Sequence, residues 1–213
     1  MELYFKPEHE DLRRRVRDFA EAEIAPVATQ LDAESRFPWE NVKKMADMGL
    51  FGVNVPKAYG GLELDYISYI LVIEELARVD ASHSITISAH STLGSSPILA
   101  FGTEEQKQRY IPLLASGRVL GGFGLTEPGA GSDAGATRTV AVRENGGYRI
   151  NGSKIFITHA GVGEIFVVTA VSDKSKGTKG ITSFIVTKET TDRDVAAKDL
   201  QRSTEASGVE LSV

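Results

Sequence analysis

The stretch TEEQKQRYIPLLASG, residues 103–117, marks the point where the pattern of the sequence changes. Its first four residues form a capping box, in which a hydroxyl and a glutamine side chain satisfy backbone amides, so we predict a helix beginning near Glu104. Pro112 is expected to interrupt or kink this helix, and residues 115–117 are expected to end it. Apolar residues recur every three or four positions before this stretch and alternate after it, so we predict helices followed by strands.

Four segments upstream have the period of helices. They cover residues 7–31, the segment after Pro38, residues 67–79 and residues 83–102. In the first, the predicted buried stripe is Leu12, Val16, Phe19, Ala20, Ile24, Val27 and Leu31. The last two segments have little polar face, which is typical of interior helices.

Five segments downstream are rich in Ile, Val, Phe and Thr, and we predict them as strands: TVAVRE (139–144), YRING (148–152), KIFIT (154–158), EIFVVTAV (164–171) and ITSFIVT (181–187). Asn-Gly at 145–146 is a strong hairpin signal. We therefore predict an α+β chain, with an N-terminal all-helical domain at residues 1–118 and an antiparallel β-barrel-like domain at residues 119–213.

Composition excludes several classes of site. The net charge of −5 argues against a nucleic-acid surface, which needs a basic face. The absence of cysteine excludes disulfides, thiolate nucleophiles and zinc-thiolate sites, and the four histidines form no pair at helical spacing. The N-terminal stretch has charges where a signal peptide needs an apolar core, and no stretch reaches the ~20 mainly apolar residues of a membrane span. We expect a cytoplasmic protein without a membrane span.

The run FGLTEPGAGSDAG, residues 123–135, holds four glycines and allows several interpretations. Residues 129–134 match the GxGxxA pattern of dinucleotide folds, but that site needs a helix after the run, and a hairpin pattern follows instead. The GxSxG pattern of a nucleophile elbow is absent; counting residues does not exclude a Ser-His-Asp triad, although nothing local supports one. A plain structural loop is the third interpretation.

The run gains meaning together with KIFIT. Two of its glycines leave the backbone bare, so a flat ligand can approach the amides, and Thr126 and Ser132 add hydroxyls. If KIFIT is a strand, Phe156 and Thr158 lie on the same face of it. An aromatic ring and hydroxyl donors suit a planar, hydrogen-bonding ring such as a flavin.

Several segments, in order and spacing, resemble the acyl-CoA dehydrogenase family: AYGG (58–61), EELARVDAS (74–82), AFGTEEQKQRYIPLLASG (100–117), FGLTEPGAGSDAG (123–135) and INGSKIFIT (150–158). The resemblance implies a helical domain, a β domain and a C-terminal four-helix domain, assembled as dimers or tetramers around FAD. It implies oxidation of an acyl-CoA thioester to trans-2-enoyl-CoA, with electrons passed to an electron-transfer flavoprotein. We expect a homotetramer of fatty acid β-oxidation.

The resemblance also implies roles for individual residues. The cofactor-binding residues are Phe123, Gly124, Leu125, Thr126, Gly131, Ser132, Phe156, Ile157 and Thr158. The substrate-binding residues are Ser132, Ala89 and Leu93, although the last two could equally be ordinary helix core.

Four further residues carry chemistry that the resemblance does not use. Glu127 and Asp133 are interpreted as loop-shaping residues, and His90 as a hydrogen-bonded core histidine. His159 departs from the family, which usually has Asn there; its imidazole could shift the potential of a flavin or face solvent.

The chain ends at VELSV, which resembles the strand that closes the family's β domain. The C-terminal domain, which in the family carries the catalytic glutamate, is missing, so no residue here is assigned as catalytic. We expect a piece of an acyl-CoA dehydrogenase; the alternative is a non-catalytic acyl-CoA or flavin binding module, or a subunit completed by another chain. Residues 189–208 are expected to be loosely ordered.

Overall fold

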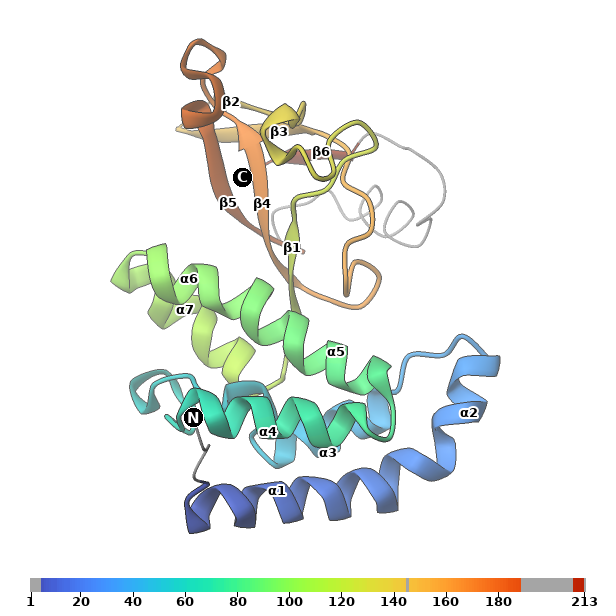
Figure 1. Cartoon of the computed structure of the whole chain (residues 1–213). Helices are drawn as coiled ribbons and strands as arrows, with labels where there is room; N and C mark the ends of the chain where they lie inside the picture. The colour runs from blue at the N-terminus through green and yellow to red at the C-terminus, as the bar shows by residue number, and fades with distance from the viewer. Residues whose placement is uncertain (1–4, 145, 189–208, 213) are drawn as a thin grey trace. The chain divides into compact units, whose positions relative to one another are not determined.

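A computed structural model describes residues 5–144, 146–188 and 209–212 of the chain. It forms two compact units, Met1–Val119 and Leu120–Val213. Figure 1 shows helices in the first unit and a sheet in the second. The segment expected to be loosely ordered, residues 189–208, lies outside the described residues.

The first unit is helical. Its α-helices are α1 (Pro7–Phe19), α2 (Ala25–Ala33), α3 (Trp39–Asp47), α4 (Tyr66–Ala77), α5 (Ala81–Ala89), α6 (Ser96–Phe101) and α7 (Glu104–Ala115). π-Helical turns η1 (Ala20–Ile24) and η4 (His90–Ser95) and short 3₁₀ turns η2 (Leu50–Gly52) and η3 (Lys57–Tyr59) complete it. Helix α4 packs against both α1 and α5 and lies between them in Figure 1. The largest fully buried side chains include Phe51, Met45, Leu76, Ile87 and Ile111.

Two of the predicted helices contain a π-helical turn that the apolar period did not predict. The amide of Ala25 donates to the carbonyl of Ala20, and that of Ser96 to Ser91, each five residues back. Each turn ends two residues before a proline, Pro26 or Pro97. A proline ring clashes with the carbonyl four residues earlier, and a widened turn relieves that clash while the helix continues.

Helix α7 begins as predicted. The amide of Gln106 donates to the Thr103 hydroxyl at 3.2 Å, and the Gln106 side chain accepts from the Thr103 amide at 2.9 Å. Of the two effects predicted for Pro112, an interruption or a kink, the interruption is wrong, because the helix continues through Pro112 to Ala115. Ile111 and Leu114 are both fully buried, and this packing offsets the hydrogen bond that the proline removes.

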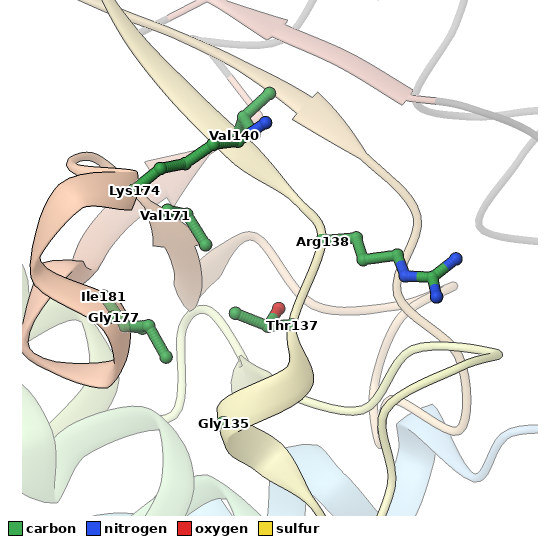
Figure 2. A pocket seen from close by; sticks show the side chains of 8 residues that line it. All are labelled: Gly135, Thr137, Arg138, Val140, Val171, Lys174, Gly177 and Ile181. Atoms are coloured by element: carbon green, nitrogen blue, oxygen red, sulfur yellow. The ribbon is translucent and has the colours of Figure 1, made fainter.

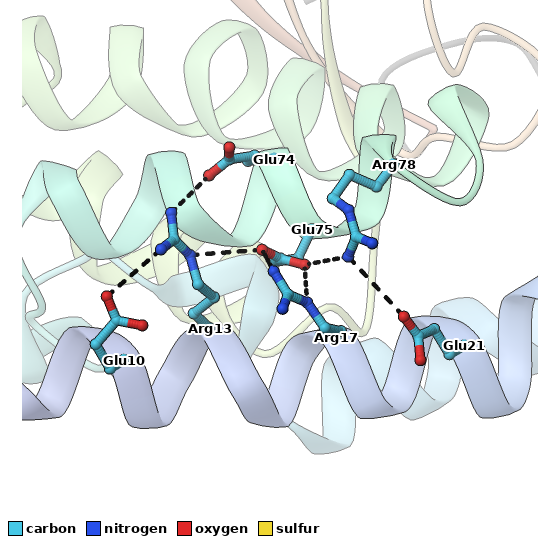
Figure 3. Close-up of polar contacts among 7 residues, drawn as sticks. All are labelled: Glu10, Arg13, Arg17, Glu21, Glu74, Glu75 and Arg78. Carbon is cyan, nitrogen blue, oxygen red and sulfur yellow. Dashed lines mark hydrogen bonds and ion pairs between the residues drawn. The ribbon is translucent and has the colours of Figure 1, made fainter.

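Helices α1 and α4 are joined by a buried carboxylate (Figure 3). Glu75 on α4 is 0% exposed and accepts two hydrogen bonds from the Arg17 guanidinium, at 2.7 and 2.8 Å. Arg78 donates a third at 2.9 Å, and Arg13 lies at 3.5 Å. The hydrogen bonds from Arg17 lower the pKa of Glu75, although burial opposes them. The carboxylate therefore stays charged and fixes α1 on α4.

The described residues of the second unit form a six-stranded sheet with short 3₁₀ turns η5 (Ala134–Ala136) and η6 (Lys174–Gly180). The strands are β1 (Gly121–Gly124), β2 (Val140–Glu144), β3 (Gly147–Gly152), β4 (Ile165–Val171), β5 (Ile181–Thr187) and β6 (Val209–Ser212). They run in the order β1-β4-β2-β3-β6, with β5 also paired to β4. The predicted hairpin is confirmed, since β2 and β3 pair antiparallel up to Glu144 and Gly147. Buried Ile150, Ala170 and Phe184 belong to the core of this unit.

The predicted all-antiparallel sheet is wrong, because β4 pairs in parallel with both β1 and β2. Among the described residues the pairings trace an open path instead of a closed ring. Alternation of apolar and polar residues identifies a strand but says nothing about the direction of its neighbour. The chain belongs to the α+β class with a mixed sheet.

Candidate functional site

The glycine-rich run leaves the sheet at the end of β1 and folds back on itself at once. The amide of Glu127 donates to the carbonyl of Ala130 at 3.0 Å, and that of Ala130 donates to Glu127 at 3.1 Å. Ala130 is buried, whereas residues 131–133 are exposed. The tight turn therefore presents the second half of the run to its surroundings.

The glycines of this region fall into two groups. A Cβ on Gly122 would lie 2.7 Å from the Thr158 carbonyl oxygen, and one on Gly124 would lie 3.2 Å from Val168. A Cβ on Gly129 or Gly131 would meet nothing within 4 Å, and neither residue has a positive φ. Packing within the unit thus explains the first pair, whereas the fold of this chain does not require the second. Bare backbone beside open space is what a flat ligand needs for close approach.

A buried polar cluster holds the run to the sheet. The Lys154 ammonium donates to the Leu125 carbonyl at 2.9 Å and to the Glu127 carboxylate at 2.8 Å. It also contacts the hydroxyls of Thr137 at 3.1 Å and Thr169 at 3.2 Å. The side chain of Lys154 is 10% exposed and that of Glu127 6%. We call Glu127, Thr137, Thr139, Lys154 and Thr169 the Lys154 cluster.

Glu127 is the acceptor at the centre of this cluster. Its carboxylate accepts from the amide of Thr139 at 3.0 Å and its hydroxyl at 2.6 Å, from the Arg138 amide at 2.7 Å, and from the Thr137 hydroxyl. Burial raises the pKa of Glu127, but the hydrogen bonds, led by that from Lys154, outweigh burial and lower it to about 2. The interpretation of Glu127 as a loop-shaping residue is confirmed. Asp133 is exposed and takes no part in the hydrogen bonds of Glu127 described above.

Burial disfavours the charged form of the Lys154 ammonium, and its pairing with Glu127 opposes this effect. Burial lowers the pKa of Lys154, and the hydrogen bond and charge of Glu127 oppose that effect. Since an ion in a low-dielectric site is costly unless it is paired, each partner stabilises the charge of the other.

Residues 154–158 do not form the predicted strand. The amide of Ile155 donates to the Thr126 carbonyl at 2.9 Å, so it binds the glycine-rich loop and no ladder. Phe156 has φ 58°, in the left-handed region, which strands do not use. Phe156 and Thr158 therefore do not share a strand face. The alternating pattern favoured a strand, but the conformation of this loop depends on hydrogen bonds to distant residues, from the Ile155 amide to Thr126 and from His159 to Gly121, which a local pattern does not reveal.

His159 ends this loop and anchors it to β1. Its Nδ1 donates to the Gly121 carbonyl at 2.8 Å, and the residue is 8% exposed, so the imidazole does not face solvent. Burial lowers the pKa of His159, although the hydrogen bond to Gly121 opposes it. The backbone is left-handed, with φ 67°. Asn and His both tolerate this region better than most residues, which explains how His can stand where the family usually has Asn.

The predicted cofactor-binding residues lie on two segments that these hydrogen bonds hold together. The hydroxyls of Thr126, Ser132 and Thr158 make no hydrogen bond within the described part of the chain, whereas those of the Lys154 cluster are all used. Phe156 is 80% exposed. The chain thus offers hydroxyls, an aromatic ring and open backbone that its own packing does not use. Such a set fits the residues that a planar, hydrogen-bonding cofactor would contact.

The predicted substrate-binding residues of the helical unit differ in exposure. Ala89 ends α5 and is 5% exposed, whereas Leu93 lies in the π-helical turn η4 and is 42% exposed. His90, in the same turn, is fully buried and hydrogen-bonds the Leu114 carbonyl at 3.0 Å, so the interpretation as a core histidine is confirmed. π-Helical turns are often found at functional sites.

A pocket of about 390 Å³ lies beside the end of the glycine-rich run (Figure 2). It is lined by Gly135, Thr137, Arg138, Val140, Val171, Lys174, Gly177 and Ile181. Figure 2 shows the Arg138 guanidinium extending away from the other lining side chains. None of the residues predicted to bind cofactor or substrate lines this pocket.

Sequence reasoning missed the role of Lys154 and of the threonines around it. The available signal was a lysine within an otherwise apolar segment, together with a glutamate inside the glycine-rich run and two threonines shortly after it. The segment was interpreted as a strand, and a strand lysine would be expected to point to solvent. Within residues 5–144, 146–188 and 209–212, no helix has the length and apolarity of a membrane span, and no group of His, Asp and Glu could hold a metal ion.

Comparison with known proteins identifies related sequences over nearly the whole chain. Residues 6–118 match the family model of the acyl-CoA dehydrogenase N-terminal domain, and residues 122–212 match that of the middle domain. A curated protein of Clostridium acetobutylicum named "Acyl-CoA dehydrogenase, short-chain specific" is 50% identical over 188 residues, which are 88% of this chain and 50% of that protein.

Solved structures agree with this assignment. The butyryl-CoA dehydrogenase of Megasphaera elsdenii matches with a TM-score of 0.85 and 41% identity, over 89% of this chain and 51% of that one. An acyl-CoA dehydrogenase of Bacillus anthracis, complexed with FAD, matches with a TM-score of 0.79 and 37% identity, over 87% of this chain and 32% of that one. The chain spans about half the length of the curated relatives it matches.

Proposed function

Because the chain belongs to the acyl-CoA dehydrogenase family, we propose that it supplies two domains, residues 1–118 and 119–213, of an FAD-dependent acyl-CoA dehydrogenase. The reaction is oxidation of an acyl-CoA thioester to trans-2-enoyl-CoA. One observation carries the proposal for this chain: the loop after β1 and residues 155–158, joined by the hydrogen bond between Thr126 and Ile155, offer hydroxyls and open backbone that the fold leaves unused.

In this proposal the two segments hold the flavin ring from different sides. Phe123, Gly124, Leu125, Thr126, Gly131 and Ser132 line one side, and Phe156, Ile157 and Thr158 line the other. The hydroxyls of Thr126 and Thr158 donate hydrogen bonds to the ring edge, which tunes its electronics. Bound FAD supplies the acceptor for the hydride that leaves the β carbon.

The proposed substrate contacts are assigned residue by residue. Ser132 meets the acyl-CoA as well as the cofactor, and Ala89 and Leu93 contact the acyl chain. The family resemblance puts the catalytic glutamate in a C-terminal domain that neither matched family model includes, so the proposal assigns no catalytic base to this chain. Transfer of electrons to an electron-transfer flavoprotein, assembly as a homotetramer and a cytoplasmic location are further parts of this proposal, and they rest on the resemblance and on composition.

Flavin binding tests the proposal directly. FAD is titrated into the purified chain, and flavin fluorescence and the visible absorption band are recorded; we expect saturable binding with a changed band. Thr158→Val should weaken binding by about three- to tenfold, the value of one hydrogen bond. Thr182→Val, at an exposed position on β5, is the matched control and should leave the affinity unchanged.

Addition of butyryl-CoA under anaerobic conditions then separates binding from chemistry. We expect the bound flavin to stay oxidised, since no base is assigned to the chain; bleaching would refute that assignment. No change in the FAD signal at saturating protein would refute the cofactor site. Flavin binding by an assembly that never bleaches, even when a relative's C-terminal domain is supplied, would favour the non-catalytic binding module.

A further inference from the structure

Lys154 connects parts of the second unit that are far apart in the sequence. Its ammonium reaches the Leu125 carbonyl and the Glu127 carboxylate at one end of the glycine-rich loop, and the Thr137 hydroxyl at the other end. Thr169, the remaining acceptor, lies on β4 at the middle of the sheet. An ammonium has three N–H donors and four acceptors lie within 3.2 Å, so all its donors are used.

The same lysine stands next to the second segment of the candidate site. Ile155 follows it directly and binds the Thr126 carbonyl, and Phe156 comes one residue later. One side chain therefore determines where both ends of the loop lie relative to residues 155–158. A displacement of Lys154 would move both segments at once.

Stability alone is a weak reason for such a residue. Burying a lysine and a glutamate costs several kcal/mol per ion, and apolar replacement of a buried ion pair is often neutral or stabilising. Buried polar groups that are fully hydrogen-bonded instead specify one arrangement among several. The Lys154 cluster is fully hydrogen-bonded in this way. Glu127 accepts hydrogen bonds from backbone amides as well as from side chains, and Lys154 donates to a backbone carbonyl as well as to side chains.

We propose that Lys154 is a positioning residue for the cofactor site, one that holds residues 125–137 and 155–158 in the arrangement that binds the flavin ring. The role rests on the proposed function. Lys154 itself does not touch the ring; it acts through the Leu125 carbonyl and through the Glu127 carboxylate.

Hydrogen exchange of the free chain tests the positioning without any flavin. Lys154→Met keeps the length and removes the charge and the donors. We expect amides of residues 123–139 and 153–160 to exchange at least about tenfold faster, while β5 is unchanged. Lys154→Arg should restore slow exchange in part, because it keeps charge and donors. Lys176→Met, which removes an exposed lysine paired with Asp173 at 3.1 Å, is the matched control and should change neither segment.

Flavin titration of the same variants supplies the second measurement. Lys154→Met should raise the FAD Kd by at least about tenfold and return the visible band toward that of free FAD, with partial rescue by Lys154→Arg. Should Lys154→Met fail to fold, Thr169→Val removes one acceptor of the ammonium outside the loop and should show both effects at smaller amplitude.

The two measurements separate the two ideas. If the wild-type chain binds no flavin, the proposed function fails, and faster exchange in both segments still supports positioning. If the wild-type chain binds flavin and both Lys154→Met and Thr169→Val bind it equally well with the same spectrum, the positioning role is overturned and the cofactor site stands. Unchanged exchange in both segments also overturns it.

Discussion

Replacement of Glu127 by glutamine should make the second unit less stable and less sensitive to acid. The Glu127 carboxylate has a pKa of about 2, against an ordinary value of 4.5. A drop of this size corresponds to about 3 kcal/mol of stability at neutral pH, at about 1.4 kcal/mol per pKa unit. The side chain is only 6% exposed, so solvent screening does not reduce this figure much.

The sign follows from the lowered pKa. Since the folded carboxyl has the lower pKa, its contribution is complete above about pH 4.5 and is lost as the pH falls through about 2. Glutamine does not titrate there. The difference in stability between wild type and Glu127→Gln should therefore be largest at neutral pH and should shrink toward pH 2.

Glutamine also changes the contacts. One carboxylate oxygen accepts from Thr139 and Lys154, and the other from the Arg138 amide. An NH₂ group at either position would face donors, and Lys154 would stay buried without its counter-charge. Breaking a buried pair in this way costs about 3–5 kcal/mol.

Urea unfolding followed by circular dichroism at several pH values between 7 and about 2 measures these quantities. Glu164→Gln is the control, because Glu164 is a half-exposed carboxylate of the same unit, 3.6 Å from Lys188; it should change stability by no more than about 0.5 kcal/mol. A Glu127→Gln protein with wild-type stability at pH 7, or with the same loss between pH 5 and 2 as wild type, would refute the reasoning.

Four further substitutions test other contacts. Glu75→Ala leaves guanidinium groups without their buried acceptor and should lower the free energy of unfolding by about 2–3 kcal/mol, measured by urea unfolding. A loss of less than about 0.5 kcal/mol would contradict the link between α1 and α4. Gly122→Ala brings a Cβ to 2.7 Å from the Thr158 oxygen and should cost about 1–3 kcal/mol, whereas Gly131→Ala should leave unfolding unchanged and weaken FAD binding; equal unfolding midpoints for both would refute the division of the glycines. Because the folded His159 imidazole has the lower pKa, wild type should lose stability as the pH falls below about 6.5, and His159→Asn should remove this pH-dependent loss. Parallel pH profiles of the urea midpoint for the two proteins would contradict this.

Local patterns allowed most of the helical unit to be predicted. The capping box at Thr103 needs only four residues, and the apolar period of α1 needs only its own segment. The π-helical turns were not predicted, because the apolar period continues through them. The prolines at 26 and 97 were the available signals, and their effect depends on how the helix relieves a clash.

Sequence patterns allowed residues of a candidate site to be proposed, but they did not predict the conformation of those residues. Lys154 and Glu127 are 27 positions apart, and nothing in either segment marks them as partners. The conformation of residues 154–158 depends on the Thr126 carbonyl and on His159 binding the Gly121 carbonyl. Such long-range hydrogen bonds override an alternating pattern, and they also determine which glycines have space around them.

Among the described residues, β2 and β4 pair through one residue pair, Val140 and Val171, which has a mechanical consequence. It divides the sheet into two leaves, β1-β4-β5 and β2-β3-β6, which are joined by one rung of backbone. Two of the connections that cross from one leaf to the other are residues 125–139, which connect β1 to β2, and residues 153–164, which connect β3 to β4. Both segments of the proposed cofactor site therefore belong to loops that cross the line where the sheet has the fewest backbone pairings. A flat ligand bound by both loops would hold the two leaves together and stiffen the unit against twisting.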